Sequence, residues 1–373
     1  MIIGIDGSRY AGEKATGVEF YSFEIISGCL AELKKKKDKI VLYSREKLKL
    51  PEDLRKMKNL ENKVLNAKRF WTLSALTKEM KSHPIDVLFV PSHVLPLSRP
   101  KKSVITIHDV AFRHLREVYS FKDYHYLNLT TRYAVKNAGK IIVPSDATRE
   151  DLIELYGCEP KKIFVVPHGF RIKKISQKEI DKVMKKSPVF KYFGIKKETP
   201  YILFVGRLES KKNLVRLVEA FYEIAKEFPK YKLVLAGKRG IGFEKLLKTI
   251  DKLKLANRVI MPGYVTEEEK FALYKYCQIF AFPSLYEGFG MPILEAFYHG
   301  KPVMTSFYSS LPEVAKDACI YVDPYDEEEI ENALRRLIKE PRYRSKLIKL
   351  GKLRLKDFSW KKAVKKTLKV IYG

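Results

Sequence analysis

The sequence predicts an α/β protein made of two Rossmann-like domains, each built on a parallel sheet. Its 373 residues are typical of two domains. Short β-branched segments alternate with longer amphipathic segments along the chain, which is the pattern of parallel strands joined by crossover helices. A lysine-rich segment near the middle interrupts this alternation. We therefore expect two sheets that face each other across a cleft, a common place for a ligand site.

The first half of the chain contains the first six candidate strands. Each is a short run rich in β-branched residues, and the chain opens on such a run rather than on a signal-peptide pattern. The candidate strands span residues 2–5, 40–43, 87–90, 104–107, 141–143 and 163–166. Between them, the amphipathic segments 17–33 and 122–137 predict helices.

The second half repeats this organisation with six more candidate strands. They span residues 201–205, 232–236, 258–261, 279–282, 302–305 and 319–322. Helices are predicted over residues 214–228, 267–276 and 327–339. Twelve strands are too many for one small open sheet, so they divide into two sets of about six.

Residues 171–199 separate the two sets of strands. This segment is rich in lysine and precedes a strongly apolar strand, so we expect a helical spacer and linker there. We place the first domain at residues 1–185 and the second at residues 186–356. A final amphipathic helix is predicted over residues 357–373. Its apolar stripe consists of Trp360, Val364, Leu368 and Ile371.

The chain is strongly basic, with 73 Lys and Arg against 44 Asp and Glu and a formal net charge of +29. Such a charge fits nucleic-acid binding, contact with an anionic membrane, or a thermophile composition. Gln occurs only at positions 177 and 278 while Lys is abundant, which favours the thermophile interpretation for most of the charge.

The cysteines and the hydropathy pattern favour a cytoplasmic protein. Four cysteines lie far apart with no Cys-x-x-Cys pair, which argues against a zinc ribbon or a disulfide scaffold and fits a reducing compartment. No apolar run approaches the ~18 residues that a membrane-spanning helix needs. The four are Cys29, Cys158, Cys277 and Cys319.

Two loops after candidate strands of the first domain carry candidate site residues. Gly7, Gly12 and Gly17 surround a strand-to-helix turn, where backbone amides could approach an anion, although an ordinary flexible turn explains them equally well. His108 and Asp109 follow another strand and should lie at its cleft end. A histidine hydrogen-bonded at a strand end is the structural alternative for this second loop.

A loop in the second domain combines Gly206, Arg207 and Lys212 between a strand and a helix that begins near Asn213. Two cations beside free helix amides suit a diphosphate, since Arg binds it with two hydrogen bonds and Lys supplies a point charge. A solvated basic loop remains the alternative, as the neighbouring Lys211 illustrates.

The most specific pattern is the segment over residues 283–295. Glu287 and Glu295 have seven residues between them, and Gly288 and Gly290 expose backbone amides next to the first glutamate. Pro292 suits the first turn of a following helix and Gly300 suits its end. Two carboxylates can accept hydrogen bonds from sugar hydroxyls, while amides and the helix dipole hold phosphate.

These segments resemble the retaining family 4 glycosyltransferases, which have the GT-B fold. The string EGFGMPILEAFYHGKPVMTS resembles the family signature of two glutamates, and VGRLESKKNL resembles its donor-phosphate loop. The segments VPSDATREDL and VVPHGF resemble parts of its first domain, and IGIDGSRY resembles the opening of its mannosyltransferase-like branch. The matches follow the family's order along nearly the whole chain. His168 stands where many relatives have Asn, which bears on the subfamily.

The resemblance implies a role for each matched residue. Arg207 and Lys212 would bind the donor diphosphate, and Glu295 would accept hydrogen bonds from the ribose. Glu287 would contact the transferred sugar, and His108 would reach a hydroxyl of that sugar. Further donor contacts would come from Gly17, from Gly206, Gly237 and Gly263 near the diphosphate and base, and from the loop residues Gly288, Phe289, Gly290 and Met291.

The resemblance also implies the reaction. Such an enzyme moves a hexose, with mannose favoured, from a nucleotide-diphosphate sugar such as GDP-mannose or a UDP-sugar to a glycan or lipid-linked acceptor. It retains the anomeric configuration, needs no metal or other cofactor, and folds its final helix back onto the first domain. A basic face would allow peripheral contact with the inner face of an anionic membrane.

Two other functions remain open from the sequence. A sugar-nucleotide epimerase on the same fold would hold a similar donor, although the signature points away from it. A basic nucleic-acid-binding protein would explain the charge, but no helix-turn-helix, zinc finger or aromatic RNA-binding string supports it. We therefore expect no nucleic-acid partner.

Overall fold

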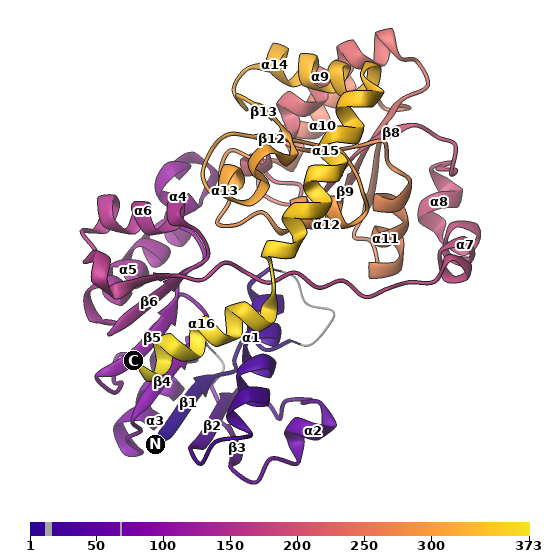
Figure 1. Cartoon of the computed structure of the whole chain (residues 1–373). Helices are drawn as coiled ribbons and strands as arrows, with labels where there is room; N and C mark the ends of the chain where they lie inside the picture. The colour runs from indigo at the N-terminus through magenta and orange to yellow at the C-terminus, as the bar shows by residue number, and fades with distance from the viewer. Residues whose placement is uncertain (12–16, 68) are drawn as a thin grey trace. The chain divides into compact units, whose positions relative to one another are not determined.

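The computed structural model describes residues 1–11, 17–67 and 69–373 (Figure 1). The chain forms two compact units. The first comprises residues 1–114, 120–169 and 358–373, and the second comprises residues 115–119 and 170–357. The twelve predicted strands and the predicted parallel arrangement are confirmed.

The division between the units lies at Gly169 and Phe170, earlier than the predicted boundary at residues 185 and 186. The reason is the packing of helix α7 (Gln177–Lys186) against helix α11 (Glu267–Tyr276) of the second unit. The Gln177 side chain donates a hydrogen bond to the Tyr276 hydroxyl at 3.1 Å and accepts one from Lys275. The expected spacer is helical, as predicted, but it belongs to the second domain.

The first domain is built on a seven-stranded parallel sheet with the order β3-β2-β1-β4-β5-β6-β7. Its central strands are almost wholly apolar because both faces of a parallel sheet are covered. The strands are β1 (Ile2–Asp6), β2 (Lys39–Ser44), β3 (Leu60–Val64), β4 (Val87–Val90), β5 (Lys102–Thr106), β6 (Lys140–Val143) and β7 (Ile163–Val165). The sequence did not predict β3, because three of its five residues are polar and it lies at the edge of the sheet.

Along the sequence, the helices of the first domain lie between these strands, except for α16, which follows the second domain. They are α1 (Val18–Leu33), α2 (Glu52–Arg55), α3 (Thr77–Ser82), α4 (Ala111–His114), α5 (Phe121–Asn137), α6 (Asp146–Tyr156) and α16 (Trp360–Tyr372).

The second domain has a six-stranded parallel sheet with the order β10-β9-β8-β11-β12-β13. Its strands are β8 (Tyr201–Val205), β9 (Lys232–Ala236), β10 (Val259–Gly263), β11 (Ile279–Phe282), β12 (Val303–Ser306) and β13 (Ile320–Val322). Besides α7 and α11, its helices are α8 (Pro188–Tyr192), α9 (Leu214–Glu227), α10 (Phe243–Lys252), α12 (Met291–Tyr298), α13 (Leu311–Ala315), α14 (Glu327–Lys339) and α15 (Pro341–Arg354). Among the residues described, no helix is both long and apolar enough to span a bilayer.

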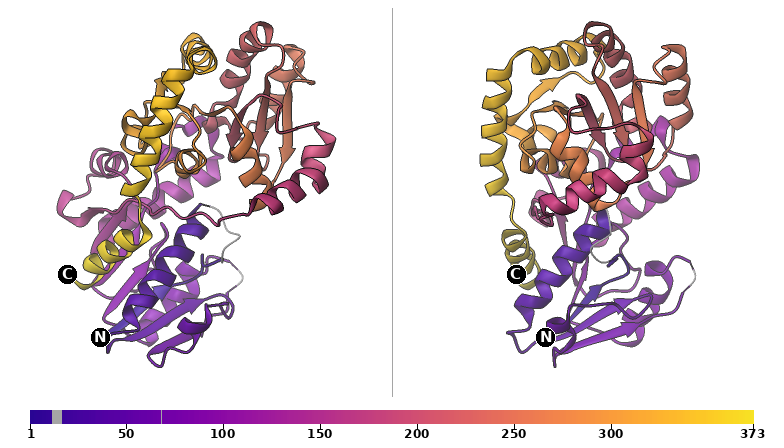
Figure 2. Two further views of the ribbon diagram at one scale, coloured as in Figure 1. Left: turned by 45° about the vertical axis from the view of Figure 1, so that its right-hand side comes forward. Right: turned by 90° about the vertical axis from the view of Figure 1, so that its right-hand side faces the viewer.

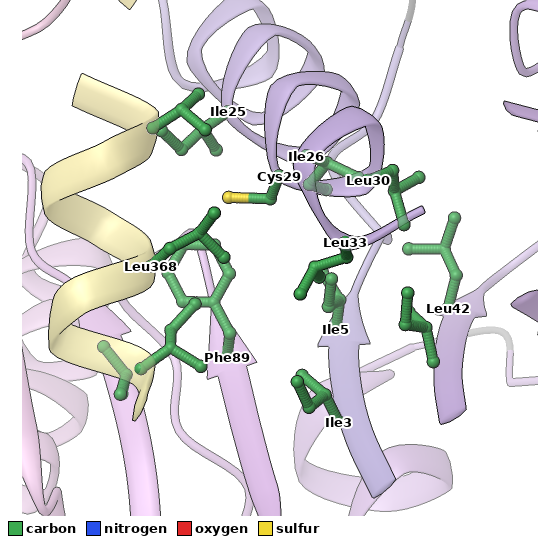
Figure 3. Packing of buried hydrophobic residues seen from close by; sticks show 14 of the residues in the cluster. Ile3, Ile5, Ile25, Ile26, Cys29, Leu30, Leu33, Leu42, Phe89 and Leu368 are labelled. Atoms are coloured by element: carbon green, nitrogen blue, oxygen red, sulfur yellow. The ribbon is translucent and has the colours of Figure 1, made fainter. Parts of the chain in front are cut away.

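Helix α16 completes the core of the first domain. It lies along α1, as the views in Figure 2 show from two sides. The approach is close because α1 presents Gly28, where an added Cβ atom would lie 2.4 Å from Val364 Cγ2. Leu368 joins Ile25 and Phe89 in the buried cluster between the helices and the sheet (Figure 3).

We expect Leu368→Ala to destabilise the first domain by about 3 kcal/mol, because it removes a large apolar side chain that is only 8% exposed and leaves a cavity. Urea unfolding followed by circular dichroism measures this change. Leu353→Ala is the matched control, since Leu353 is 58% exposed and should change the free energy of unfolding by less than about 0.5 kcal/mol. Equal effects of the two substitutions would contradict the assignment of α16 to this core.

Candidate functional site

Three glycines join the carboxyl ends of neighbouring strands in the second domain. The amide of Gly206 donates to the carbonyl of Ala236 at 3.0 Å, and the amide of Gly237 donates to the carbonyl of Gly263 at 2.8 Å. A Cβ atom at position 237 would lie 1.7 Å from the Gly206 carbonyl oxygen, so only glycine fits there. The loops after β8, β9 and β10 are thus fixed to one another at the sheet edge where ligands of such folds bind.

Lys212 and Glu287 form an ion pair at this edge. The Lys212 ammonium donates to Glu287 Oε1 at 2.5 Å, and both side chains are about nine-tenths buried, with exposed fractions of 11% and 12%. Lys212 Nζ also lies 5.5 Å from the centre of the Phe282 ring. The pair brings together the two loops that the sequence identified as most informative.

The backbone of Glu287 is held on both sides by two serines. The Glu287 amide donates to Ser309 Oγ at 2.9 Å, and the Ser310 hydroxyl donates to the Glu287 carbonyl at 2.8 Å. Ser309 has a φ of 54°, a left-handed conformation that is uncommon for a residue other than glycine. Such local strain occurs mainly where the surroundings impose it, often at functional sites.

The glycine-rich loop leads directly into helix α12. Gly290 precedes the helix with a φ of 97°, and Pro292 occupies the first turn, as predicted. Gly288 and Phe289 are buried, while Met291 at the start of α12 is partly exposed. The first amides of a helix have no partner within the helix, so this terminus suits an anion or a sugar hydroxyl.

Glu295 lies one turn further along α12 and pairs with a lysine that the sequence did not single out. Lys270 of helix α11 donates to Glu295 Oε1 at 2.9 Å and lies 3.0 Å from Glu267 Oε2. Arg207, in contrast, has an exposed side chain after β8. Its stem runs beside Gly240, where a Cβ atom would be 2.9 Å from Arg207 Cγ.

Two predicted residues, His108 and Gly17, belong to the first domain. The His108 ring lies at the end of β5, 4.7 Å from the Tyr21 ring and 5.7 Å from the His168 ring between centres. Gly17 precedes α1 with a φ of 58°, and none of the described residues has an atom within 4 Å of the place that a Cβ atom would take. Gly12 lies outside the described residues.

Burial lowers the pKa of His108 to about 4 and lowers that of His168 well below its ordinary value. His108 is therefore neutral near pH 7. Its Nε2 atom lies 3.1 Å from the Pro91 carbonyl oxygen, which can only accept, so Nε2 carries the proton. Nδ1 is then left with a lone pair that can accept a hydrogen bond from a hydroxyl group.

Both halves of the chain match known glycosyltransferase families. Residues 177–354 match the family described as "Glycosyl transferases group 1", and residues 29–174 match "Glycosyltransferase Family 4". The chain belongs to the family 4 glycosyltransferases. The resemblance noted from the motifs is thereby confirmed, and this glycosyltransferase carries the predicted two-glutamate signature in its second domain.

The glycosyltransferase is similar to bacterial mannosyltransferases. The O-antigen chain mannosyltransferase B of Escherichia coli is 28% identical over 279 residues, which are 74% of this chain and 72% of that protein. The serotype-specific mannosyltransferase WbdA of the same organism is longer, and the matched region covers 32% of its length at 26% identity.

Solved structures show the GT-B fold. WaaG, a glycosyltransferase involved in lipopolysaccharide biosynthesis, matches with a TM-score of 0.75 at 17% identity over 100% of both chains. HepE from Anabaena, in complex with UDP-glucose, matches with a TM-score of 0.72 at 18% identity over 99% of both chains. At these identities the likeness establishes the fold.

Sequence reasoning missed several residues that shape the site. Ser309 and Ser310 lie just beyond the quoted signature string, and nothing in the sequence pattern shows that they hold Glu287. Lys270 looks like one more lysine on a helix, and only the structure reveals its two carboxylate partners. Tyr21 lies on the buried face of α1, so its contact with both histidines could not be separated from ordinary packing.

The histidines of the first domain predict a pH dependence of stability. His108 has a pKa of about 4 when folded and 6.5 ordinarily, so in this range the unfolded chain binds a proton that the folded chain does not. Stability should therefore fall as the pH falls, by about 2 kcal/mol for His108 between pH 7 and pH 5.

His108→Gln should remove that share of the pH dependence, as measured by urea unfolding at both pH values. His125→Gln is the matched control, because His125 is exposed on α5 of the same domain. The interpretation fails if His108→Gln keeps the full pH dependence of the unmodified chain.

Proposed function

We propose that the glycosyltransferase moves a hexose, with mannose favoured, from a nucleotide-diphosphate sugar to a glycan or lipid-linked acceptor, with retention of configuration and without a metal. The observation that carries this proposal is the buried contact between Lys212 and Glu287 at the carboxyl edge of the second sheet. The similarity to O-antigen mannosyltransferase B supports mannose. The UDP-glucose complex of HepE keeps uridine donors among the candidates.

The cations account for binding and departure of the diphosphate. When a nucleotide sugar reacts, negative charge develops on the leaving diphosphate, and preorganised cations stabilise it most effectively where water is excluded. Lys212 is buried, so its charge would act on the diphosphate with little screening by water. Arg207 is exposed, and its side chain could fold over a bound ligand. With these two cations and the N-terminus of α12, the protein itself supplies the neutralising charge that a metal would otherwise provide.

We expect donor binding to break the ion pair between Lys212 and Glu287. Lys212 cannot keep its short contact with Glu287 and also contact a phosphate oxygen in the same direction. We expect the diphosphate to replace Glu287 as the partner of Lys212. The Glu287 carboxylate is then released toward the transferred sugar, beside the amides of Gly288, Phe289, Gly290 and Met291.

The remaining predicted residues complete the proposed roles. Glu295 would accept hydrogen bonds from the ribose hydroxyls. The nucleotide would lie beside Gly206, Gly237 and Gly263, and Gly17 would let the first loop approach the donor. His108 would accept a hydrogen bond from a donor-sugar hydroxyl through Nδ1. Attack of the acceptor on the same face that the diphosphate leaves, with a phosphate oxygen taking the proton, gives retention; a double displacement through Glu287 is the alternative route.

Nucleotide binding tests the donor assignment. A nucleoside diphosphate at about 100 times its Kd should stabilise the folded chain by about 2.7 kcal/mol, so GDP, UDP and ADP are compared by their shift of the melting temperature. Lys212→Met should abolish the shift that the preferred nucleotide produces. Lys248→Met is the control, because Lys248 is exposed on α10 of the same domain.

Transfer is measured with the sugar nucleotide that the binding experiment selects. Glu287→Gln should reduce transfer by about two to three orders of magnitude. The same variant should bind the free nucleoside diphosphate at least as tightly as the unmodified chain, because it removes a negative charge that competes for Lys212. Weaker binding by Glu287→Gln would contradict the exchange of partners, and conversion of the sugar nucleotide to an epimer without acceptor would favour an epimerase.

We also propose that the enzyme is cytoplasmic and that it contacts an anionic membrane surface through basic helices. Helix α16 buries its apolar side in the first domain and exposes lysines on the other. The exposed lysines are Lys361, Lys362, Lys365, Lys366 and Lys369. Each cation near an anionic surface contributes about 1 kcal/mol.

The protein should therefore sediment with phosphatidylglycerol vesicles and not with phosphatidylcholine vesicles at low salt. The charge reversal Lys362→Glu/Lys366→Glu should weaken this binding about tenfold or more. The control is Lys226→Glu on α9, which should weaken binding much less. Absence of binding to anionic vesicles would overturn this part of the proposal.

A further inference from the structure

Lys270 bridges two carboxylates at a partly buried position beside the proposed donor site. Its Nζ atom lies 2.9 Å from Glu295 Oε1 and 3.0 Å from Glu267 Oε2. Lys270 and Glu295 are 17% and 18% exposed, whereas Glu267 is 48% exposed. Burial alone would lower the pKa of Lys270, but the charges of Glu295 and Glu267 outweigh it and raise the pKa. Lys270 is therefore a fixed cation at any working pH.

The start of helix α11 is held so that Lys270 has a defined place. The Thr266 hydroxyl accepts the Glu269 amide at 3.2 Å, and Glu269 Oε2 accepts the Thr266 amide at 2.8 Å, which together form a capping box. Glu269 Oε1 also accepts a hydrogen bond from the Ser187 hydroxyl at 2.5 Å. Four residues after the capping Thr266, the Lys270 side chain reaches across to Glu295 of α12.

We propose that Lys270 is a positioning residue for nucleotide recognition: it holds the Glu295 carboxylate in one orientation so that this carboxylate accepts hydrogen bonds from the ribose hydroxyls. This inference rests on the proposed function and names the group that makes its ribose contact possible. The Lys270 contact occupies one direction at Oε1, while a carboxylate has about four acceptor positions. Capacity for two hydroxyl donors therefore remains.

The physical reason is the cost of a partly buried carboxylate without a cation. Such a group turns toward water, and it then loses the fixed direction in which it could accept hydrogen bonds from a ligand. The hydroxyl of Tyr274 is also buried nearby, and its pKa is raised by burial and by the charge of Glu295. Without Lys270, Glu295 would face this environment with no cation in direct contact.

The charge of the cluster distinguishes Lys270 from the residues that bind the diphosphate. Lys270, Glu267 and Glu295 together carry one net negative charge, so the cluster repels an anion and suits a neutral hydroxyl-bearing group. Glu295 lies four residues beyond Met291, or about 6 Å along α12 from its N-terminus. A ribose is separated from the phosphate that it carries by a similar distance.

The experiment compares binding of ordinary and 2′,3′-dideoxy nucleoside diphosphates by isothermal titration calorimetry. GDP is compared with 2′,3′-dideoxy-GDP, and UDP is compared with 2′,3′-dideoxy-UDP. For the preferred base, the unmodified chain should bind the ribose form about 100-fold more tightly, because two hydroxyls donate to a charged acceptor. Lys270→Met should reduce this preference about tenfold and leave the affinity for the dideoxy form within about twofold.

Two further variants separate positioning from simple packing. Lys270→Arg keeps the charge and should retain most of the preference, whereas Lys270→Gln keeps a polar side chain without the charge and should lose it. Lys226→Met on α9 is the matched control, since Lys226 forms an exposed ion pair with Glu223 in the same domain.

The outcomes are distinct. Equal weakening of ribose and dideoxy forms in Lys270→Met and Lys270→Gln would show that Lys270 only joins two helices, and would overturn the inference while the proposed function stands. An unchanged ribose preference in both variants would overturn it as well. If the unmodified chain binds none of the nucleotides, the proposed function fails and this inference falls with it.

Discussion

The contact between Gly206 and Gly237 is the constraint on which the second domain's functional edge depends. The Gly206 carbonyl occupies the space that a Cβ atom at position 237 would need. Because the two loops meet without side chains between them, β8 and β9 can deliver their following residues to one place. Arg207 and the loop to Lys212 leave from this contact, and Gly263 closes it on the other side through its carbonyl.

In the described part of the second domain, the charges of the two signature glutamates are paired with lysines rather than isolated. Lys212 meets Glu287, and Lys270 meets Glu295, so each glutamate of the signature has its own lysine. The two pairs differ in what they can do. In the first pair, Lys212 and Glu287 are the residues to which we assign contacts with the diphosphate and the sugar. The second pair has Glu267 as an additional carboxylate and keeps a net negative charge. A single strongly basic protein thus contains one position suited to an anion and one suited to hydroxyl groups.

Most of the fold could be predicted from the sequence because parallel strands buried on both faces are continuous apolar runs. Strand β3 was not predicted, because an edge strand needs no such apolar run. The boundary between the domains was misplaced because the packing of α7 on α11 depends on side chains such as Gln177, which carry no signal in the pattern. Glu287, Lys212 and Glu295 were identified through glycines and spacing. Their partners Ser309, Ser310 and Lys270 were not, because a hydrogen bond between distant segments leaves no local periodicity.

The position of helix α16 has a consequence for how the chain is made. Val364, Leu368 and Ile371 belong to the same buried cluster as Ile3 and Ile5, so segments from both sides of the second domain share one core. During synthesis the strands of the first domain emerge before the second domain, whereas the helix that covers α1 emerges after it. The first domain is therefore completed only after the whole second domain has left the ribosome. A chain that stops before Trp360 would contain every residue of the second domain and would still leave the first domain with an open apolar surface.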